Sequence, residues 1–354
     1  MRILLLTRYD VSGPSSRYRF YQYIPFLEKQ GWEITIKPLL SNNYIKHLYE
    51  KTSLPIVEIV SSYFQRVLIL LSKNKFDIVW IEQEAFPWII PLFEKILITS
   101  KTKIVADYDD AFFHRYDLHK SSLISLLLGK KIDMVMSTAD LVLAGNEYLA
   151  ERAKQNKAKR IEIFPTVVDT DKFVNTEIAK DKKITIGWVG SPSTAKYLYL
   201  IEEALKDLNR FSDVKFSFIG AGELKFDNLQ IDNIAWNEAS EIEEISKFDV
   251  GIMPLEDGPF ERGKCGFKLI QYLSCGIPVV GSPVGVNDKI IQHGVNGFKA
   301  ETTEDWIKYL TILKEDSDLR KKMASEGRKL IIRDYSLENN SNRLVSLFNN
   351  ITQS

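Results

Sequence analysis

The chain has 354 residues, of which 45% are hydrophobic and 27% are charged, as expected for a soluble globular protein of about two domains. Basic and acidic residues both total 47, so no global basic footprint points to nucleic acid, and we expect no such partner. No apolar run approaches the ~18 residues of a membrane span. Only two cysteines occur, Cys265 and Cys275, and we expect a reduced, cytoplasmic protein.

Short β-rich runs alternate with helical ones through the first half of the chain. The expected strands cover residues 3–7, 32–38, 77–81, 103–106, 140–144 and 161–164. A helix is expected over residues 17–30, and it closes at Gly31. Such alternation predicts a parallel sheet covered by helices.

The same pattern restarts in the second half. The expected strands there cover residues 184–187, 215–219, 233–236, 249–253 and 278–280, with a helix over 197–209. We therefore predict an α/β protein of two tandem Rossmann-like domains, 1–170 and 171–335, next to a polar linker at 175–183. A last helix within 336–354 is expected to pack back on the N-terminal domain.

Residues 263–282 have the pattern of a glycine-containing loop, a short helix, a glycine stop and a buried strand. Gly266 lets the backbone approach a ligand, and Phe267, Lys268 and Leu269 open a helix whose N–H groups and dipole attract an anion. Pro278 forbids the helix from continuing. The pattern predicts a phosphate-binding site, although a helix–strand turn without a ligand would have the same sequence.

Two further glycine loops follow expected strands of the second half. Gly190 and Ser191 precede Lys196, and together these residues could hold a diphosphate from the side opposite Lys268. Gly220 and Gly222 lack the third glycine of a dinucleotide fingerprint, so we interpret their loop as a wall of a nucleotide pocket. The alternative for Lys196 is a surface lysine in the first turn of a helix.

In the first half, ligand-type residues follow the first and fourth expected strands, where α/β sheets bind ligands. Gly13 permits close approach, Arg17 can reach an anion, and a helix-capped turn is the alternative. Asp107, Asp109 and Asp110 could hold a divalent metal. We favour acceptor hydroxyl binding or base chemistry without metal, with His114 close by, over that metal site and over simple helix capping.

Two segments combine apolar and basic residues. Residues 56–71 carry an apolar helical stripe with Lys51 and Arg66 nearby, and residues 123–128 precede Lys130 and Lys131. Such faces suit an anionic membrane surface. We favour the more common alternative, in which the stripe packs on a sheet.

With these residues assembled, the chain resembles the retaining nucleotide-sugar glycosyltransferases of the GT-B fold, specifically glycosyltransferase family 4. The most specific parts are residues 267–282, Gly285 and 294–298, which look like the donor-site helix, Pro-Val-Val strand and Asn-Gly turn of that family. Residues 165–173 are similar to its interdomain segment, and Gly13 lies in the usual N-terminal loop.

The chain departs from the family at two places. Gly263 and Gln271 stand where the family usually has glutamates, of which the second would grip the ribose and the first the donor sugar. Replacing a charged hydrogen bond by a neutral one at Gln271 costs about 1 kcal/mol, or roughly fivefold in affinity. Glu261 or Asp257 could substitute for the first glutamate from a reshaped loop.

The resemblance implies two domains that face a central cleft, and transfer of a sugar from a UDP- or GDP-linked donor with retention of configuration. The acceptor would be a glycan or lipid-linked molecule of surface polysaccharide or glycoconjugate biosynthesis, with peripheral contact at the inner face of the membrane. The nucleotide sugar is a co-substrate, and neither a cofactor nor a metal is expected. The implied catalytic residues are Lys196, Lys268, Asp107, Asp109 and Asp110. The implied donor-binding residues are Gly190, Ser191, Lys196, Gly220, Gly222, Gly266, Phe267, Lys268, Leu269 and Gln271. On the acceptor side, the implied residues are Gly13, Arg17 and His114.

Two other functions fit the same sequence. The absent glutamates suggest a non-catalytic nucleotide-sugar binder or partner subunit. A nucleotide-sugar epimerase, which also resembles GT-B proteins, would act without an acceptor.

Overall fold

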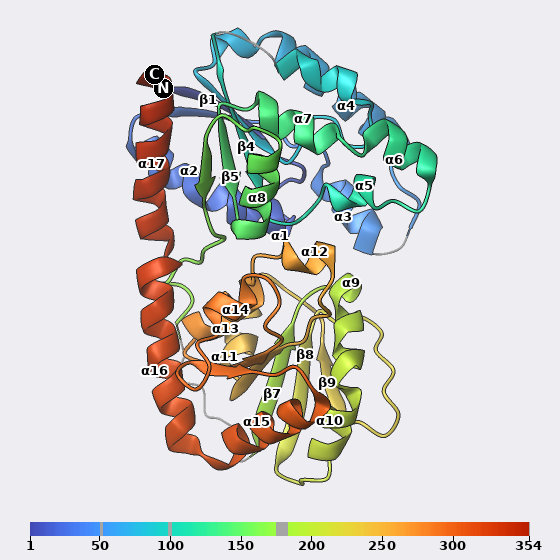
Figure 1. Ribbon diagram of the computed structural model, residues 1–354, viewed down its shortest axis with the longest axis vertical. Coiled ribbons are helices and arrows are strands. Elements are labelled where there is room, and N and C mark those ends of the chain that lie inside the picture. Colours follow the sequence, from blue (N-terminus) through green and yellow to red (C-terminus); the bar gives the residue numbers. More distant parts are fainter. Residues whose placement is uncertain (50–51, 98–100, 175–182, 354) are drawn as a thin grey trace. The chain divides into compact units, whose positions relative to one another are not determined.

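The computed structural model describes residues 1–49, 52–97, 101–174 and 183–353, and it forms two compact units (Figure 1). The first unit comprises Met1–Thr166, Gly263–Cys265 and the chain from Leu337 onward, and the second comprises Val167–Arg262 and Gly266–Ser336. The division therefore lies four residues before the expected boundary, and three residues of the later chain join the first unit. Most of the expected linker, 175–182, lies outside the described residues.

The first unit is a six-stranded sheet in the order β2-β1-β3-β4-β5-β6, and all of its strand pairs are parallel. The strands are β1 (Arg2–Leu6), β2 (Glu33–Ile36), β3 (Ile78–Glu82), β4 (Lys103–Tyr108), β5 (Leu141–Ala144) and β6 (Ile161–Ile163). The helices that accompany them are α1 (Pro14–Arg19), α2 (Ile24–Lys29), α3 (Asn42–Tyr49), α4 (Ile56–Leu71), η3 (Pro91–Leu97), α5 (His114–Asp117), α6 (Ser122–Leu128), α7 (Lys131–Thr138) and α8 (Glu147–Gln155). Every residue of β3 is buried, as in a sheet covered on both faces.

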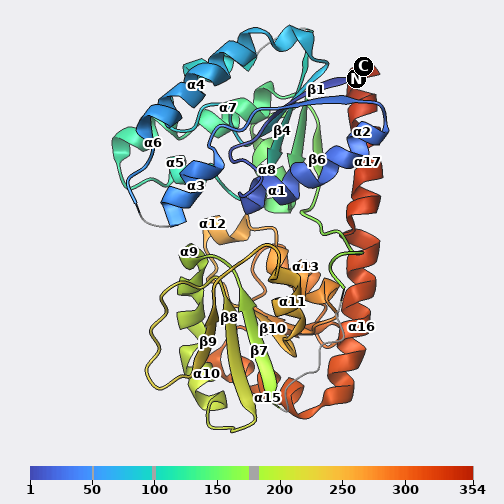
Figure 2. The same cartoon turned by 180° about the vertical axis from the view of Figure 1, so that it is seen from behind.

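The C-terminal helix α17 (Leu337–Gln353) belongs to the first unit, where it lies beside the sheet (Figure 2). The ring of Phe348 packs edge-on against Trp80 of β3, with centroids 5.2 Å apart. Arg343 donates to the carbonyl oxygen of Ile163 at 2.7 Å. These contacts make the last helix part of the first unit's core.

The second unit repeats the architecture with a parallel sheet in the order β12-β11-β10-β7-β8-β9. The strands are β7 (Ile184–Val189), β8 (Val214–Ile219), β9 (Ile231–Ile234), β10 (Val250–Met253), β11 (Val279–Gly281) and β12 (Gly297–Lys299). The helices are α9 (Pro192–Ala195), η4 (Lys196–Ile201), α10 (Glu202–Leu208), α11 (Glu241–Ser246), α12 (Pro259–Arg262), α13 (Phe267–Ser274), α14 (Asn287–Ile290), α15 (Thr303–Glu315) and α16 (Ser317–Asp334).

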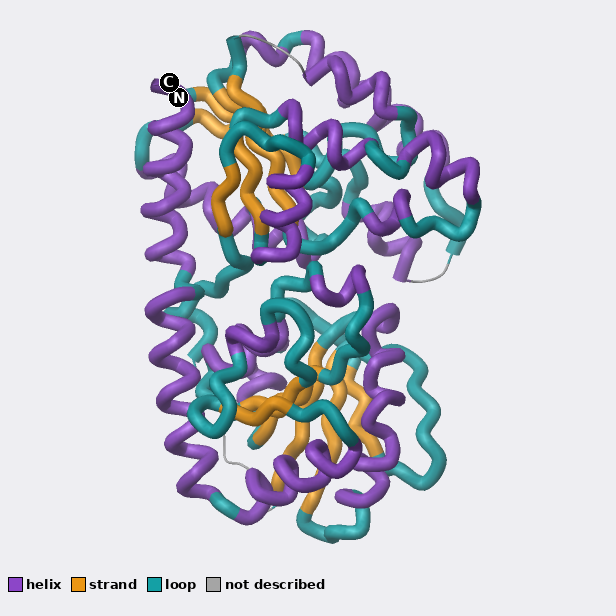
Figure 3. The backbone as a smooth tube through the Cα atoms, viewed as in Figure 1, coloured by secondary structure: helices purple, strands orange, loops and turns teal. Residues whose placement is uncertain are grey.

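The prediction of two Rossmann-like α/β domains is thus confirmed, and Figure 3 shows a layer of strands in each unit. The predicted strands lie within a few residues of the observed ones. The short edge strand β12 was not predicted, since residues 294–298 were interpreted as a turn. The predicted helix over residues 197–209 begins as a 3-10 helix, η4, and becomes α-helical only at Glu202.

The preferred interpretation of the apolar stripe on α4 is wrong for most of its residues. Large parts of Ile56, Val60, Phe64 and Leu71 are exposed instead of packed on the sheet. The helix turns Arg66 inward, where its guanidinium donates to the carbonyl oxygens of Thr7 and Lys37, each at 2.9 Å. Because this side of α4 must satisfy buried carbonyl groups, the apolar stripe is left facing outward.

Arg66 and Lys131, two of the basic residues expected beside the apolar segments, are buried and are not surface cations. Arg66 is 3% exposed, and Lys131 is fully buried with its Nζ 2.7 Å from Glu84 Oε2. Lys130 remains exposed, whereas Lys51 lies outside the described residues. Across residues 1–49, 52–97, 101–174 and 183–353, no helix combines the length and apolar character that a membrane crossing requires.

Candidate active site

The predicted donor loops of the second unit lie together at the carboxyl ends of β7 and β8. The N–H of Gly190 donates to Ile219 O at 3.0 Å, and a Cβ built on Gly220 would lie only 2.3 Å from the carbonyl oxygen of Gly190. Gly220 has a φ of +73°, a conformation that favours glycine. Both positions therefore require glycine so that the two loops can approach each other.

Lys268 extends from α13 to the same loops. A Cβ on Gly190 would meet Lys268 Cε at 2.8 Å and the ring of Trp188 at 2.5 Å, and Lys268 Nζ lies 5.4 Å from the centroid of that ring. The Trp188 side chain, which the sequence reasoning missed, thus holds the ammonium group by a cation–π contact. The structure brings Gly190, Gly220 and Lys268 together as predicted.

The residue before α13 is a glycine in the left-handed conformation. Gly266 has a φ of +65°, and a Cβ there would meet Ile290 Cδ1 at 2.6 Å. The N–H of Leu269 already donates to the carbonyl oxygen of Gly266 at 3.0 Å, so we remove Leu269 from the predicted phosphate-binding set. The positive dipole end of α13 still begins at Phe267 and Lys268.

Lys196 differs from Lys268 in its surroundings. Its side chain is 61% exposed, and its Nζ lies 3.8 Å from Glu256 Oε1. Ser191, at the other end of α9, exchanges hydrogen bonds with Thr194 in a capping box. A surface pair of this kind contributes ~0–1 kcal/mol, so Lys196 is an exposed and weakly paired cation at the edge of the loops.

Gln271, the position of the absent ribose-binding glutamate, is buried beside a carboxylate. Its Nε2 donates to Glu241 Oε1 at 3.1 Å, and the indole N–H of Trp236 donates to the same oxygen at 2.9 Å. Glu241 was not predicted, because it lies 30 residues before Gln271 in the chain. A negative charge is therefore present next to Gln271, although it comes from another helix.

Gly263, the position of the other absent glutamate, lies in the first unit without space for a side chain. A Cβ there would meet Ala111 Cβ at 2.4 Å and its nitrogen at 2.8 Å. Asn146 Nδ2 donates to the carbonyl oxygens of Gly263 and Lys264 at 2.8 and 3.0 Å, and Cys265 Sγ donates to Asp109 O at 2.7 Å. Close packing of this segment thus accounts for the departure from the family pattern.

The two acidic residues suggested as substitutes are both engaged. The hydroxyl of Tyr197 donates to Glu261 Oε1, and both side chains are buried. Asp257 accepts two hydrogen bonds from Arg262 at 2.6 and 2.8 Å in an exposed bidentate pair. Both carboxylates therefore accept hydrogen bonds from side chains of the protein instead of being available to a ligand.

The first unit has a polar cluster at the carboxyl ends of β1, β3 and β4. Ser15 Oγ donates to Asp109 Oδ2 at 2.5 Å and also lies 3.1 Å from Glu82 Oε1. Glu82 Oε2 accepts from the hydroxyl of Ser16 at 2.6 Å and from the N–H of Arg8 at 2.7 Å. Two carboxylates linked by one hydroxyl can bind a sugar hydroxyl or accept its proton.

The surroundings of Glu82 shift the pKa of its carboxyl group. Burial, together with the charge of Asp109, raises the pKa of Glu82 to about 7, although hydrogen bonds from Ser16, Arg8 and Ser15 oppose the rise. Gln83, held at a φ of +64°, accepts from Arg8 at 3.1 Å. Glu82, Gln83 and Arg8 were not predicted, since Glu82 ends a strand whose sequence indicates only burial.

Asp107 is part of the core instead of the site. Its carboxylate accepts from Arg19 at 2.9 and 2.5 Å and from the indole of Trp80 at 3.2 Å, and both charged groups are almost fully buried. Removing one partner of such a pair leaves an uncompensated buried charge. We therefore withdraw Asp107 from the predicted catalytic set, whereas Asp109 and Asp110 remain partly exposed.

The acceptor-side residues have mixed outcomes. Both ring nitrogens of His114 are engaged, at 2.8 Å from Asp117 Oδ1 and at 2.8 Å from the Tyr148 hydroxyl, so His114 holds α5 and α8 together. The guanidinium of Arg17 stacks on Tyr18 at 4.9 Å. Gly13 begins α1 with no space for a Cβ beside Tyr9. Within the described parts of the chain, no three or more His, Cys, Asp or Glu side chains gather as metal ligands would.

Comparison with known proteins agrees with this architecture. Residues 169–330 match the family model described as "Glycosyl transferases group 1", which is somewhat under half of the chain. The sequence is 23% identical over 175 residues to TuaH of Bacillus subtilis, a glycosyltransferase assigned provisionally to teichuronic acid biosynthesis, and covers 43% of that protein. The chain thus spans less than half the length of the curated relatives it matches.

Solved structures match over almost the whole chain. The structure of HepE from Anabaena in complex with UDP-glucose superimposes with a TM-score of 0.72 at 14% identity, covering 99% of this chain and all of that one. Sucrose-phosphate synthase from Thermosynechococcus elongatus gives a TM-score of 0.74 at 12% identity, with 99% of each chain covered. The protein therefore has the GT-B fold, and residues 169–330 are similar to the glycosyltransferase group 1 family model.

Proposed function

We propose that this protein is a glycosyltransferase that moves a sugar from a UDP- or GDP-linked donor to a glycan or lipid-linked acceptor, with retention of configuration. The context would be surface polysaccharide or glycoconjugate biosynthesis in the cytoplasm. The family-model match and the similarity to TuaH support the reaction class. HepE, which shares the fold, was solved with UDP-glucose, and this favours a nucleotide-sugar donor.

One observation carries the proposal: the loops of the second unit combine close backbone approach with a preorganised cation. Gly190 and Gly220 leave no room for side chains, and Lys268 is held beside them by Trp188 at the start of α13. Glycine loops, a helix N-terminus and a lysine are the elements that bind a diphosphate. We assign the donor to this edge, with Gln271 and Glu241 on the side of the ribose.

The chemistry follows from this charge distribution. Negative charge grows on the leaving phosphate as the glycosidic bond breaks, and Lys268 together with the N-terminal end of α13 would stabilise that charge. Such preorganised groups act by electrostatics, and typically contribute ~3–4 kcal/mol each to transition-state stabilisation. The proposed mechanism requires no metal ion.

The acceptor is assigned to the polar cluster of the first unit. Glu82 and Asp109 share the hydroxyl of Ser15, so an incoming sugar hydroxyl can replace Ser15 as their donor. With a pKa of about 7, Glu82 can exchange a proton near neutral pH. Asp110, on the loop after β4, and Arg17, in α1, could complete the acceptor contacts.

Two alternatives remain distinguishable by product. The engaged substitutes Glu261 and Asp257, together with the crowded Gly263, favour a non-catalytic binder, which would bind donor tightly without turnover. An epimerase would convert the donor into an isomer with no acceptor present.

The test is a thermal-shift screen of the purified protein with UDP, GDP, ADP and their common sugar conjugates, followed by acceptor-free incubation. A ligand at 100 times its dissociation constant stabilises by about 2.7 kcal/mol. We expect a shift with one nucleotide family, slow donor hydrolysis, and no shift in the Lys268→Ala variant. An isomerised donor would identify an epimerase, and the absence of any shift would contradict the proposal.

A further inference from the structure

The exposed apolar side chains of this protein are concentrated in one part of the first unit. Of the 23 large hydrophobic residues that the described chain leaves exposed, 15 lie between Leu54 and Leu127. They line α4, the segment around η3, and α6, with Val57 85% and Leu126 82% exposed. Monomeric proteins rarely leave so many apolar side chains together in water, and such concentrations mark interaction sites.

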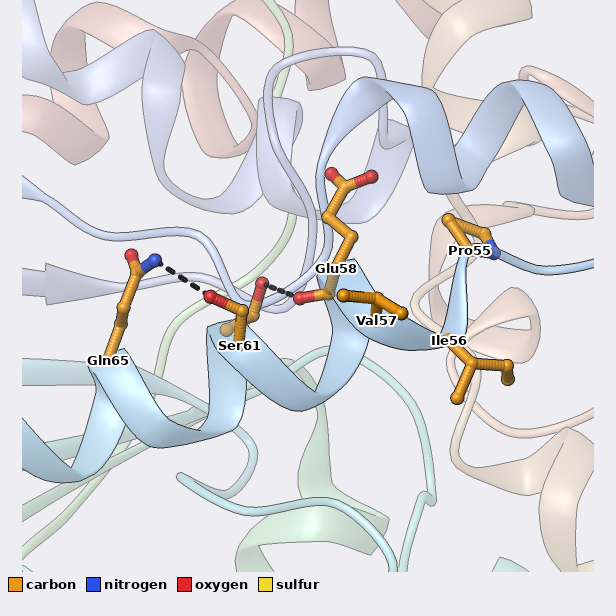
Figure 4. Close-up of a pocket in the computed structure, with 7 residues that line it drawn as sticks. Pro55, Ile56, Val57, Glu58, Ser61 and Gln65 are labelled. Atoms are coloured by element: carbon orange, nitrogen blue, oxygen red, sulfur yellow. Dashed lines mark hydrogen bonds between the residues drawn. The ribbon is translucent and has the colours of Figure 1, made fainter.

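On α4 the exposed residues form a continuous helical stripe. Val57, Val60, Phe64, Leu68 and Leu71 recur at spacings of three and four residues, and each is more than half exposed. Figure 4 shows Val57 next to Ser61 in the first turns of the helix, and Ile56, Val57, Ser61 and Gln65 all line a pocket there. The amide of Gln65 donates to Ser61 at 3.2 Å, so these polar groups are satisfied within the helix.

The three elements form one connected surface within the first unit. The hydroxyl of Tyr63 on α4 donates to Pro87 O at 2.8 Å, and the adjacent Trp88 packs on Tyr116 with ring centroids 5.1 Å apart. Ser125 of α6 in turn donates to Asp117 O at 3.1 Å. Both α4 and α6 lie on the side of the unit opposite α17 (Figures 1 and 2).

Trp88 lies at the junction of these elements in a backbone conformation that is rare for its residue type. It is 49% exposed with a φ of +63°, and its N–H donates to the hydroxyl of Tyr116 at 3.0 Å. A strained backbone is retained where the surrounding structure imposes it, often for function. Trp is also the side chain most typical of the boundary between water and lipid.

The charges of this surface favour an anionic partner. Lys75, Lys95, Lys120 and Lys130 are exposed in or beside the three elements, and no acidic residue of 52–97 or 113–132 is classed as exposed. The carboxylate of Glu58, the acidic residue of α4, is engaged within the unit, where it accepts hydrogen bonds from Asn43 Nδ2 at 2.9 Å and from the hydroxyl of Ser41. Apolar side chains flanked by lysines are the composition that binds the interface of an anionic bilayer.

We infer that α4, the segment around η3, and α6 dock the first unit on the surface of an anionic lipid bilayer. The inference extends the proposed function, since an enzyme seated on a bilayer through its acceptor-binding unit would be suited to a lipid-linked acceptor. The apolar side chains enter the headgroup boundary, and the surrounding lysines contact anionic headgroups. The protein lies on the bilayer and does not span it.

The test is flotation of the full-length protein with two kinds of vesicle. One is pure phosphatidylcholine, and the other contains about 40% phosphatidylglycerol, which gives it the negative surface charge of an anionic membrane. We expect binding to the anionic vesicles, and a loss of about tenfold or more for Phe64→Glu and for Leu126→Glu, which place a charge in the apolar interface. Ile332→Glu, on an exposed apolar residue of α16 in the second unit, is the matched control and should bind as the unchanged protein does. Raising the salt to 1 M should weaken binding, because the Debye length falls from about 10 Å to 3 Å.

Several outcomes would overturn this inference. The first is equal binding to neutral and anionic vesicles, and the second is unchanged binding of both glutamate variants. The third is a protein that binds no vesicles and that light scattering shows to be a dimer, which Phe64→Glu dissociates. The thermal shift with nucleotide sugar is measured on the same variants. It should be unchanged, because both substitutions lie in the first unit. If the protein without substitutions shows no thermal shift with any nucleotide sugar, the proposed function is contradicted instead.

Discussion

The two units of this protein share one sheet architecture but differ at the carboxyl ends of their strands. In the second unit those ends carry glycines that permit close backbone approach and a lysine stacked on Trp188. In the first unit they carry two carboxylates, Glu82 and Asp109, joined through the hydroxyl of Ser15. A parallel sheet therefore determines where ligands bind, and the loops determine which charge they bind.

The difference gives each edge a distinct chemical task. The second unit offers positive charge and helix N–H groups, which suit a diphosphate. The first unit offers hydrogen-bond acceptors, which suit sugar hydroxyls and their protons. Substitutions at each edge can test whether the two units bind these different groups.

The largest effect is expected for Lys268→Ala. Removing the cation that we propose stabilises the leaving phosphate should lower turnover by about 10²–10³-fold. Initial rates of donor hydrolysis or transfer measure the change. Lys322→Ala, an exposed lysine of α16, is the control and should retain full activity. Near-normal turnover in Lys268→Ala would contradict the assignment of the diphosphate site to the second unit.

The next effect concerns Glu82 and pH. Because the pKa of Glu82 rises from 4.5 to about 7 on folding, the folded protein holds a proton that the unfolded chain has released between those values. Stability contributed by this group is thus present below pH 4.5 and lost as the pH rises to 7, by about 3 kcal/mol in total. In Glu82→Gln this component disappears.

Urea unfolding of both proteins at several pH values between 4.5 and 8 measures it. The comparison uses the slope of the free energy of unfolding against pH, so a constant cost of the substitution does not matter. Identical slopes in the two proteins would show that Glu82 does not titrate in this range.

A third prediction concerns the position of the absent glutamate. Restoring it by Gly263→Glu should destabilise the protein by about 1–3 kcal/mol, since any Cβ would overlap Ala111. Gly263→Ala is the matched variant, because it adds the same Cβ without charge, and it should cost a similar amount. A tolerated alanine beside a destabilising glutamate would assign the cost to the rest of the glutamate side chain instead of to the overlap of its Cβ. Denaturant unfolding distinguishes the two.

The smallest effect is expected for Lys196→Ala. The Lys196 side chain is 61% exposed and only loosely paired with Glu256, so its loss should lower turnover by about fivefold, well below the loss for Lys268→Ala. Parallel rate measurements on the two variants give the ratio. Equal losses would mean that Lys196 closes on the donor as tightly as Lys268 does.

Much of the fold could be predicted from periodicity, because buried strands and glycine stops leave local signals. The loops at Gly190 and Gly220 were found because each follows a strand, and the loop at Gly266 was found because a glycine opens a short helix there. The structure brings Gly190 and Gly220 beside Lys268. The edge strand β12 was missed, since three residues next to an Asn-Gly turn carry no periodic pattern.

The remaining features depend on contacts that a linear pattern does not encode. Glu82 accepts hydrogen bonds from residues 66 to 74 positions away, and Gln271 meets Glu241 only after folding. The stripe on α4 was assigned to the sheet because periodicity indicates an apolar face without indicating what covers it. Burial of Arg66 on the opposite side reversed that assignment.

The most direct test of the division between the two edges is amide hydrogen exchange with and without the nucleotide identified by thermal shift. We predict that the nucleotide protects the loops at residues 190–196, 220–222 and 266–268 and leaves residues 8–19 and 82–84 unchanged. Protection confined to the loops of the first unit would contradict the assignment of the donor to the second unit.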